Sequence, residues 1–284
     1  MPIIMDLSNI MVSTLMAQLG RHTNAQVDES MLRHMVLNTI RSNKKKFTEY
    51  GELIIAADDK NYWRKSAFPY YKAMRKVNRE SSELDWNAIF SALNKIKQEI
   101  KDNFPYKVVQ VPHAEADDII AVVCEERGQL LASGERILIL SADKDMTQLQ
   151  SFANVDQWDP IRKRWLKNTT PEKTLFEHIV KGDTGDGIPN VRSNDDAIVT
   201  KTRQQPVRQK MIDEWYGDIN TMPTEVRRNF ERNKLLIDFG CIPEEIKAQI
   251  REQLNEKNKI GREKLFNYFI EHQLRNLLTD IGDF

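Results

Sequence analysis

Short apolar segments alternate with longer stretches of helical patterning over the first 180 residues, and this alternation limits the fold more than any other feature of the sequence. The apolar segments are typical of buried strands, and they are Pro2–Met5, Leu53–Ala57, Lys107–Val111 and Arg136–Leu140. Helical spacing fills the gaps between them, over Ser8–Leu19, from Asp28 or Ser30 to about Tyr50, from Asp85 to Pro105 and over Ala116–Arg127. This order predicts an α/β fold in which helices flank a mostly parallel central sheet. We expect a hairpin at the edge of that sheet, formed by Asn154–Asp159 and Arg164–Lys167.

The pattern changes after Gly182, where only helical spacing continues. The expected helices cover about Pro206–Tyr216, Glu225–Leu236, Pro243–Asn255 and Arg262–Thr279. We therefore predict a domain boundary near residue 181. Residues 1–181 would form the α/β domain, and residues 182–284 would form a smaller all-helical domain.

Acidic residues follow all four predicted strands at their carboxyl ends, namely Asp6, Asp58 and Asp59, Glu115 and Asp117, and Asp143 and Asp145. In an open parallel sheet these ends meet at one rim, where ligands bind, so we expect the acids to gather there. Carboxylates packed so closely repel one another unless cations lie between them. Oxygen ligands without His or Cys favour a hard ion, Mg²⁺ or Mn²⁺.

Each acidic motif also has a simpler explanation. Acids in the first turn of a helix stabilise the helix dipole, and Asp6 or Asp143 could be an ordinary N-cap. The glycine-rich loop Gly182–Val191 carries Asp183 and Asp186, which could merely form its turns. Helix caps do not explain why acids follow all four predicted strands at their carboxyl ends, and this shared position favours a metal site.

The composition is that of a globular protein without a membrane span or a disulfide framework. The 284 residues include 42 Lys and Arg against 42 Asp and Glu, and two distant cysteines, Cys124 and Cys241. If eight acids gather in one site, the rest of the molecule has an excess of bases, as a nucleic-acid partner requires. We expect a monomer in the cytoplasm, the host cytoplasm if the chain is viral.

Five motifs together resemble the flap-endonuclease family of structure-specific 5′ nucleases. They are Ile4-Met5-Asp6, Ile55-Ala56-Ala57-Asp58, Glu115-Ala116-Asp117-Asp118, Ser141-Ala142-Asp143-Lys144-Asp145 and Gly182-Asp183-Thr184-Gly185-Asp186. Further likeness in Tyr62-Trp63-Arg64, Tyr70-Tyr71-Lys72 and Lys264–Phe269 points to the phage ribonuclease H branch, of the T-even type.

The resemblance implies two Mg²⁺ ions, for which Mn²⁺ could substitute. It places Asp6, Asp58, Glu115 and Asp117 around the first ion, and Asp143, Asp145, Asp183 and Asp186 around the second. Asp58 is preferred to Asp59 because it directly ends the strand. Gly187 stands where the family usually has Asn, and Arg192–Asp196 lacks the family's Gly-x-Gly hairpin, which leaves potassium binding open.

Bases and aromatic residues without an acid fill the segment Lys60–Arg79. Such a mixture suits a channel for single-stranded nucleic acid, and the alternative is a solvated helix face beside a few core aromatics. By resemblance the segment is an arch over the site, with Lys72 and Arg75 at the scissile phosphate beside the catalytic acids Asp117 and Asp143. The residues expected to bind nucleic acid are Arg64, Lys65, Tyr71, Lys72, Arg75, Lys76, Arg203 and Arg208, the last two through duplex contacts of the helical domain.

The function implied by the resemblance is that of a 5′→3′ exonuclease and flap endonuclease with ribonuclease H activity. Such an enzyme removes RNA primers and adjacent DNA from lagging-strand fragments. Its substrates would be RNA–DNA hybrids and branched or nicked duplex DNA with a 5′ end, and its partners would include single-strand-binding protein and the sliding clamp. Two alternatives stay open: a PIN-type ribonuclease, and a non-catalytic factor that binds DNA forks.

Overall fold

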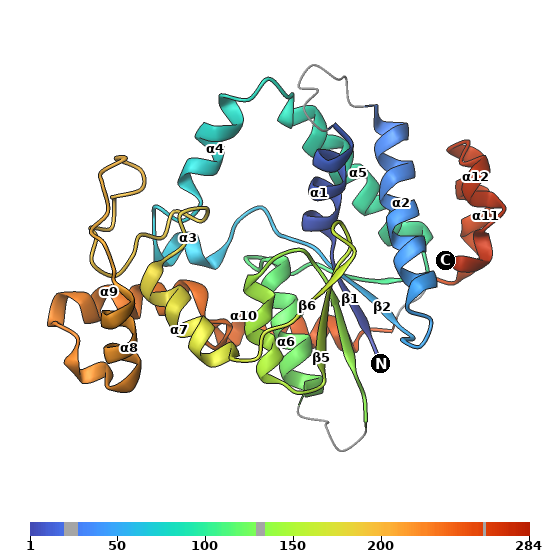
Figure 1. Ribbon diagram of the computed structural model, residues 1–284. Coiled ribbons are helices and arrows are strands. Elements are labelled where there is room, and N and C mark those ends of the chain that lie inside the picture. The colour runs from blue at the N-terminus through green and yellow to red at the C-terminus, as the bar shows by residue number, and fades with distance from the viewer. Residues whose placement is uncertain (20–27, 129–133, 258–259) are drawn as a thin grey trace.

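A six-stranded sheet forms the centre of the molecule in a computed structural model, which describes residues 1–19, 28–128, 134–257 and 260–284 (Figure 1). The strand order is β3-β2-β1-β4-β5-β6. The strands are β1 (Ile3–Asp6), β2 (Leu53–Ala56), β3 (Lys107–Val109), β4 (Ile137–Leu140), β5 (Val155–Asp159) and β6 (Arg164–Leu166). All neighbours are parallel except β5 and β6, which form an antiparallel hairpin at the edge. The predicted parallel sheet and its edge hairpin are confirmed.

Successive strand residues point to opposite faces of the sheet, and helices cover both faces. Ile3 and Met5 face one core, whereas Ile4 faces the other. The first core is covered by α1 (Leu7–Leu19), α2 (Glu29–Lys46) and α5 (Trp86–Asn103). The second is covered by α6 (Ala116–Gly128) and α10 (Glu244–Asn255). Strands buried on both faces read as continuous apolar runs, which is why these segments stand out in the sequence.

Asp side chains fix the start of two long helices, as the sequence predicts. The Asp28 carboxylate accepts hydrogen bonds from the backbone N–H groups of Ser30 and Met31, and Asp85 accepts one from Ala88. These bonds satisfy donors that have no partner within the helix. The helix α2 ends at Lys46 and not near Tyr50.

The region after residue 181 is helical, and in the described part of it we find an isolated bridge between Asp183 and Ile188 but no strand. Its remaining helices are α8 (Gln209–Gly217), α9 (Thr224–Ile237), α11 (Leu265–Glu271) and α12 (Arg275–Leu278). The predicted continuous helix Arg262–Thr279 is wrong. The chain breaks between α11 and α12, where Gln273 adopts a φ of 55° that a right-handed helix does not allow.

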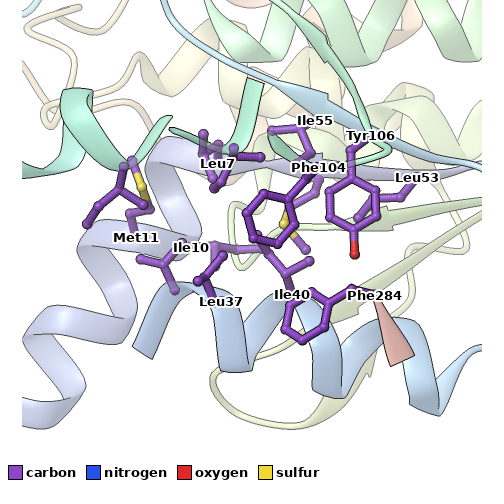
Figure 2. Close-up of a cluster of buried hydrophobic side chains, with 14 of the residues drawn as sticks. Leu7, Ile10, Met11, Leu37, Ile40, Leu53, Ile55, Phe104, Tyr106 and Phe284 are labelled. Carbon is purple, nitrogen blue, oxygen red and sulfur yellow. The ribbon is translucent and has the colours of Figure 1, made fainter. Parts of the chain in front are cut away.

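This region packs against all three hydrophobic clusters of the protein. The third cluster joins α8 and α9 to α7 (Pro171–Lys181) and takes in Phe68 and Tyr71 from the first half of the chain. α10 covers the second core, and α11 and α12 cover the first. Figure 2 shows Phe284 among the first-core side chains, close to Phe104. The helical region is therefore spread around the sheet.

Two short helices, α3 (Trp63–Ala67) and α4 (Ala73–Glu80), connect β2 to α5. Figure 1 shows α4 rising away from α3 before the chain returns to α5. No residue of α4 is buried. Among the described helices, none is long and apolar enough to cross a membrane.

Candidate active site

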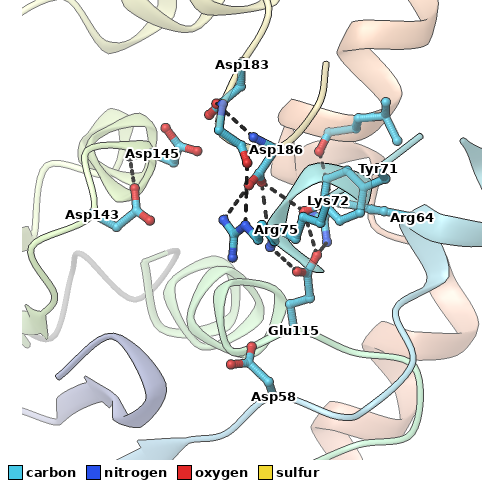
Figure 3. Close-up of polar contacts among 12 residues, drawn as sticks. Asp58, Arg64, Tyr71, Lys72, Arg75, Glu115, Asp143, Asp145, Asp183 and Asp186 are labelled. Carbon is cyan, nitrogen blue, oxygen red and sulfur yellow. Dashed lines mark hydrogen bonds and ion pairs between the residues drawn. The ribbon is translucent and has the colours of Figure 1, made fainter. Parts of the chain in front are cut away.

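The acids predicted from the strand ends and from the glycine-rich loop meet in one cleft of about 730 Å³ at the carboxyl edge of the sheet. Seven of them line it: Asp6, Asp58, Asp117, Asp143, Asp145, Asp183 and Asp186. The eighth, Glu115, is 2% exposed and lies among cationic side chains beside the cleft (Figure 3). Asp59 also lines the cleft, so the choice of Asp58 over Asp59 as a ligand stays a prediction.

Several of these carboxylates also hold the local backbone in place. Asp6 accepts the N–H of Asn9 at 2.9 Å, and Asp143 accepts the N–H of Asp145 at 2.9 Å. Asp183 accepts the N–H groups of Gly185 and Asp186 at 2.7 and 3.1 Å. The helix-cap and turn explanations are therefore correct as far as they go. Each cap also fixes the direction of a carboxylate that lines the cleft.

The electrostatics of the cleft disfavour so many charges without cations. Burial, Asp58 and Asp143 raise the pKa of Asp6 to about 7. Burial and the Asp143 charge raise the pKa of Asp145 to about 7. Burial, followed by Asp6 and Asp143, raises the pKa of Asp117 well above its ordinary value. Crowded carboxylate oxygens of this kind are suited to hard divalent cations, which would restore the ionised forms.

Two cationic side chains reach into the acids, one from Lys72, which precedes α4, and one from Arg75 in the first turn of α4. Lys72 Nζ forms ion pairs with Glu115 and, at 3.6 Å, with Asp186, and Arg75 pairs with Asp186. The Lys72 backbone, at a φ of 55°, donates to the Asp186 carbonyl at 2.7 Å. The structure thus brings Lys72 and Arg75 beside the acids, as the sequence predicts.

Gly187 is required by this close approach between the two segments. Its φ is 76°, and a Cβ at this position would lie 2.6 Å from the Tyr70 carbonyl oxygen. A side chain here would push the Lys72 segment away from Asp186. An Asn at this position would therefore not fit this close approach.

The structure buries Arg64 and Tyr71, so their role in binding nucleic acid stays a prediction that their present contacts do not support. Arg64 is 2% exposed; its guanidinium pairs with Glu115 at 2.9 Å and Asp118 at 2.8 Å and donates to the Leu236 carbonyl at 2.8 Å. Tyr71 is 4% exposed, and its hydroxyl lies 2.9 Å from Glu115. Both residues hold Glu115 from beneath the cleft. Lys65, Lys76, Arg203 and Arg208 are exposed, and their role in binding stays a prediction.

The sequence did not reveal two residues of the site. His178, in the last turn of α7, lies with each ring nitrogen 3.5 Å from a carboxylate oxygen, one of Asp145 and one of Asp183. Burial lowers the pKa of His178, but its contact with Asp183 and the charge of Asp145 outweigh this and raise it. These three side chains lie close enough to hold one ion. Asp118 is fully buried, accepts the Trp63 indole N–H at 3.1 Å and anchors Arg64.

Two family models match consecutive parts of the chain. Residues 4–179 match the 5′-3′ exonuclease, N-terminal resolvase-like domain, and residues 169–284 match the C-terminal domain of T4 RNase H. The chain belongs to the 5′-3′ exonuclease family. The resemblance predicted from the five motifs is confirmed, and with it the assignment of the chain as a phosphodiester-cleaving nuclease.

Individual members of the 5′-3′ exonuclease family extend the comparison. The chain is 32% identical to the ribonuclease H of Enterobacteria phage T4 over 294 residues, covering 99% of this chain and 95% of that protein. It is 30% identical to the flap endonuclease Xni of Shewanella sediminis, over 45% of this chain and 49% of that one. The solved structure of the T5 D15 protein with metal ions is 16% identical, with a TM-score of 0.61, and covers 89% of this chain and 98% of that one. This last likeness confirms the fold.

Proposed function

We propose that this chain is a 5′→3′ exonuclease and flap endonuclease with ribonuclease H activity that removes RNA primers and adjacent DNA from lagging-strand fragments. The observation that carries the proposal is the cleft, which is lined by seven carboxylates from five segments of the chain together with Lys72 and Arg75. The T4 relative, which this chain matches over nearly its whole length, is named a ribonuclease H, and the Xni relative is named a flap endonuclease.

The donor set suits two divalent cations, and we propose Mg²⁺, with Mn²⁺ as a substitute. Asp6, Asp58, Glu115 and Asp117 would hold one ion, and Asp143, Asp145, Asp183 and Asp186 would hold the other. Metal ions bound in this way supply positive charge at the scissile phosphate and acidify a water molecule. In support, solved T5 structures of the same fold were obtained with metal ions.

The side chains of the cleft have distinct tasks in this proposal. Lys72 and Arg75 now neutralise Glu115 and Asp186, and both can turn to the non-bridging oxygens of a phosphate that enters the cleft. There they would stabilise charge that develops as the phosphodiester bond breaks. Arg64 and Tyr71 would keep Glu115 in position while Lys72 moves, because they hold the same carboxylate from the buried side.

The single-stranded part and the duplex part of the substrate would be bound on different sides of the cleft. Lys65 on α3 and Lys76 on the exposed helix α4 would contact the single strand as an arch. Arg203 and Arg208 would contact the duplex behind the cut, and residues 182–284 would supply most of this duplex surface. A T5 relative of the same fold was solved in complex with DNA, which supports a branched or nicked DNA duplex as substrate. Single-strand-binding protein and the sliding clamp remain proposed partners, and the host cytoplasm the proposed location.

A cleavage assay tests the proposal against its alternatives. The substrates are 5′-labelled RNA–DNA hybrids, 5′-flap duplexes and single-stranded RNA, each incubated with and without Mg²⁺. We expect Mg²⁺-dependent products that end in a 3′ hydroxyl. Binding without cleavage of any substrate would indicate the non-catalytic fork-binding factor. Cleavage of single-stranded RNA alone would indicate the PIN-type ribonuclease.

A further inference from the structure

One face of α5 lines the same cleft as the acids. Trp86, Phe90, Leu93, Asn94 and Lys97 follow helical spacing, and all of them border the cleft. Lys97 interacts electrostatically with Asp58 and Asp59. Phe90 lies seven residues earlier along the helix, which is about 10 Å from Lys97. This face therefore leads from the acids to a pair of aromatic rings.

The two rings give the cleft an apolar surface, which Leu93 of the same helix extends. The ring centroids of Trp86 and Phe90 are 5.5 Å apart, and the planes are inclined by 32°. The centroid distance lies within the range of favourable aromatic contacts. Both side chains are half-buried, so they pack on the first core with one part and border the cleft with another.

Cationic groups accompany the rings. The Arg79 guanidinium lies 5.3 Å from the centroid of Phe90, and Arg75 and Lys72 line the same cleft. A guanidinium beside an aromatic face can stack on a nucleobase or bind the adjoining phosphate. By contrast, Trp63, Phe68 and Tyr71 of the segment Lys60–Arg79 are all buried, and Tyr62 of that segment is half-buried and borders the cleft.

We propose that Trp86 and Phe90 hold an unpaired nucleobase of the 5′ strand by stacking, with Arg79 at the neighbouring phosphate. The occupant must be a nucleotide because the surface combines rings with cations and opens into the same cleft as the catalytic acids. At about 3.4 Å per stacked base, the distance from Lys97 places this nucleotide within about three positions of the cut. The proposal rests on the proposed nuclease function and adds a base-binding site to it.

The test combines substitutions in the protein with abasic sites in the substrate. Affinity is measured without divalent cations for a duplex with a 5′ overhang and for three versions, each abasic at one of the first three unpaired positions. The variants are Phe90→Leu, which removes the ring and keeps apolar volume, and Phe90→Trp, which keeps a ring. Phe266→Leu is the matched control, since Phe266 is 56% exposed on α11 and does not border the cleft.

We expect Phe90→Leu to weaken binding of the intact overhang about 5- to 100-fold, as for loss of one stacked base. The wild type should bind one of the three abasic substrates more weakly than the intact overhang, by a similar factor. Phe90→Leu should bind that abasic substrate as well as the wild type does. Phe90→Trp and Phe266→Leu should bind normally. Equal losses on intact and abasic substrates would overturn the proposal, and so would a wild-type affinity insensitive to all three abasic positions. The second result requires no substitution, so it stands even if Phe90→Leu fails to fold. Wild-type cleavage with Mg²⁺ would show that the proposed function survives either outcome.

Discussion

Replacing Asp6 with Asn should stabilise the metal-free protein at neutral and alkaline pH. Asp6 is 4% exposed, and burial together with Asp58 and Asp143 raises its pKa from 3.8 to about 7. The folded state therefore keeps a proton on Asp6 that the unfolded state loses above pH 4. Because the folded state binds more protons between about pH 4 and pH 7, the free energy of unfolding falls as the pH rises through this window.

The size of the effect follows from the same shift. A shift of about three pKa units, at 1.36 kcal/mol each, corresponds to about 4 kcal/mol. The free energy of unfolding of the wild type is therefore about 4 kcal/mol lower at pH 8 than at pH 4. Asn keeps an oxygen for the Asn9 N–H but carries no charge, so the variant avoids this loss. Asp6→Asn should thus exceed the wild type by up to about 4 kcal/mol at pH 8, and by little at pH 4.

Urea denaturation in EDTA, from pH 4 to pH 8, measures this difference directly. Asp59→Asn is the matched control. Although partial burial raises the pKa of Asp59, hydrogen bonds from the His113 and Lys60 backbone lower it overall, so this substitution should not stabilise the protein at pH 8. Mg²⁺ should reduce the difference in the free energy of unfolding between wild type and Asp6→Asn at pH 8. Parallel pH profiles for these two proteins in EDTA would refute the reasoning.

Four further predictions concern cleavage, binding and packing. Asp143→Asn should abolish Mg²⁺-dependent cleavage with substrate binding intact or tighter; activity within tenfold of wild type would contradict the metal assignment. Lys72→Ala should lower the single-turnover rate more than the affinity, and the reverse would make Lys72 a positioning residue. Arg64→Met should destabilise the fold by about 3–5 kcal/mol in thermal or urea unfolding, because it removes the cation that pairs with the buried Asp118 and one of the two that pair with Glu115; a change under 1 kcal/mol would contradict this. A triple variant in which Ala replaces Arg203, Arg208 and Lys210 should change duplex binding but not the cleavage rate of bound substrate. The slope of the logarithm of its binding constant K against the logarithm of the salt concentration should flatten by at most about 0.9 per lost phosphate contact.

Local signals explain why the sequence predicts the sheet and most of the acids. Each strand is a short apolar run, and the acid that follows it is a neighbour in sequence, so Asp6 and Asp143 are placed by the strand alone. The glycine loop with Asp183 is likewise recognisable by its own spacing. Agreement among several local signals then predicts one shared rim without knowledge of the tertiary contacts.

Contacts between distant segments explain what the sequence did not predict. Arg64 stands in a run of bases, and its burial depends on Glu115 and Asp118, which lie more than fifty residues away. His178 joins the site only because α7 packs beside the turn that carries Asp145. The break at Gln273 depends on how α11 and α12 pack on the first core. Charge and periodicity describe a segment but not its neighbours.

The third hydrophobic cluster gives the cleft two separately supported sides. Phe68 and Tyr71 fix the Lys72 segment to α7, α8 and α9, and Asp186 is bonded to the same segment. Asp6 and Asp117, in contrast, are carried by the sheet and α6. A displacement of α7, α8 and α9 against the sheet would therefore change the spacing between Lys72 and these acids. Duplex bound to α7, α8 and α9 would then set the distance between Lys72 and the acids carried by the sheet and α6. Only a correctly placed substrate would bring the two sides to the spacing that cleavage requires.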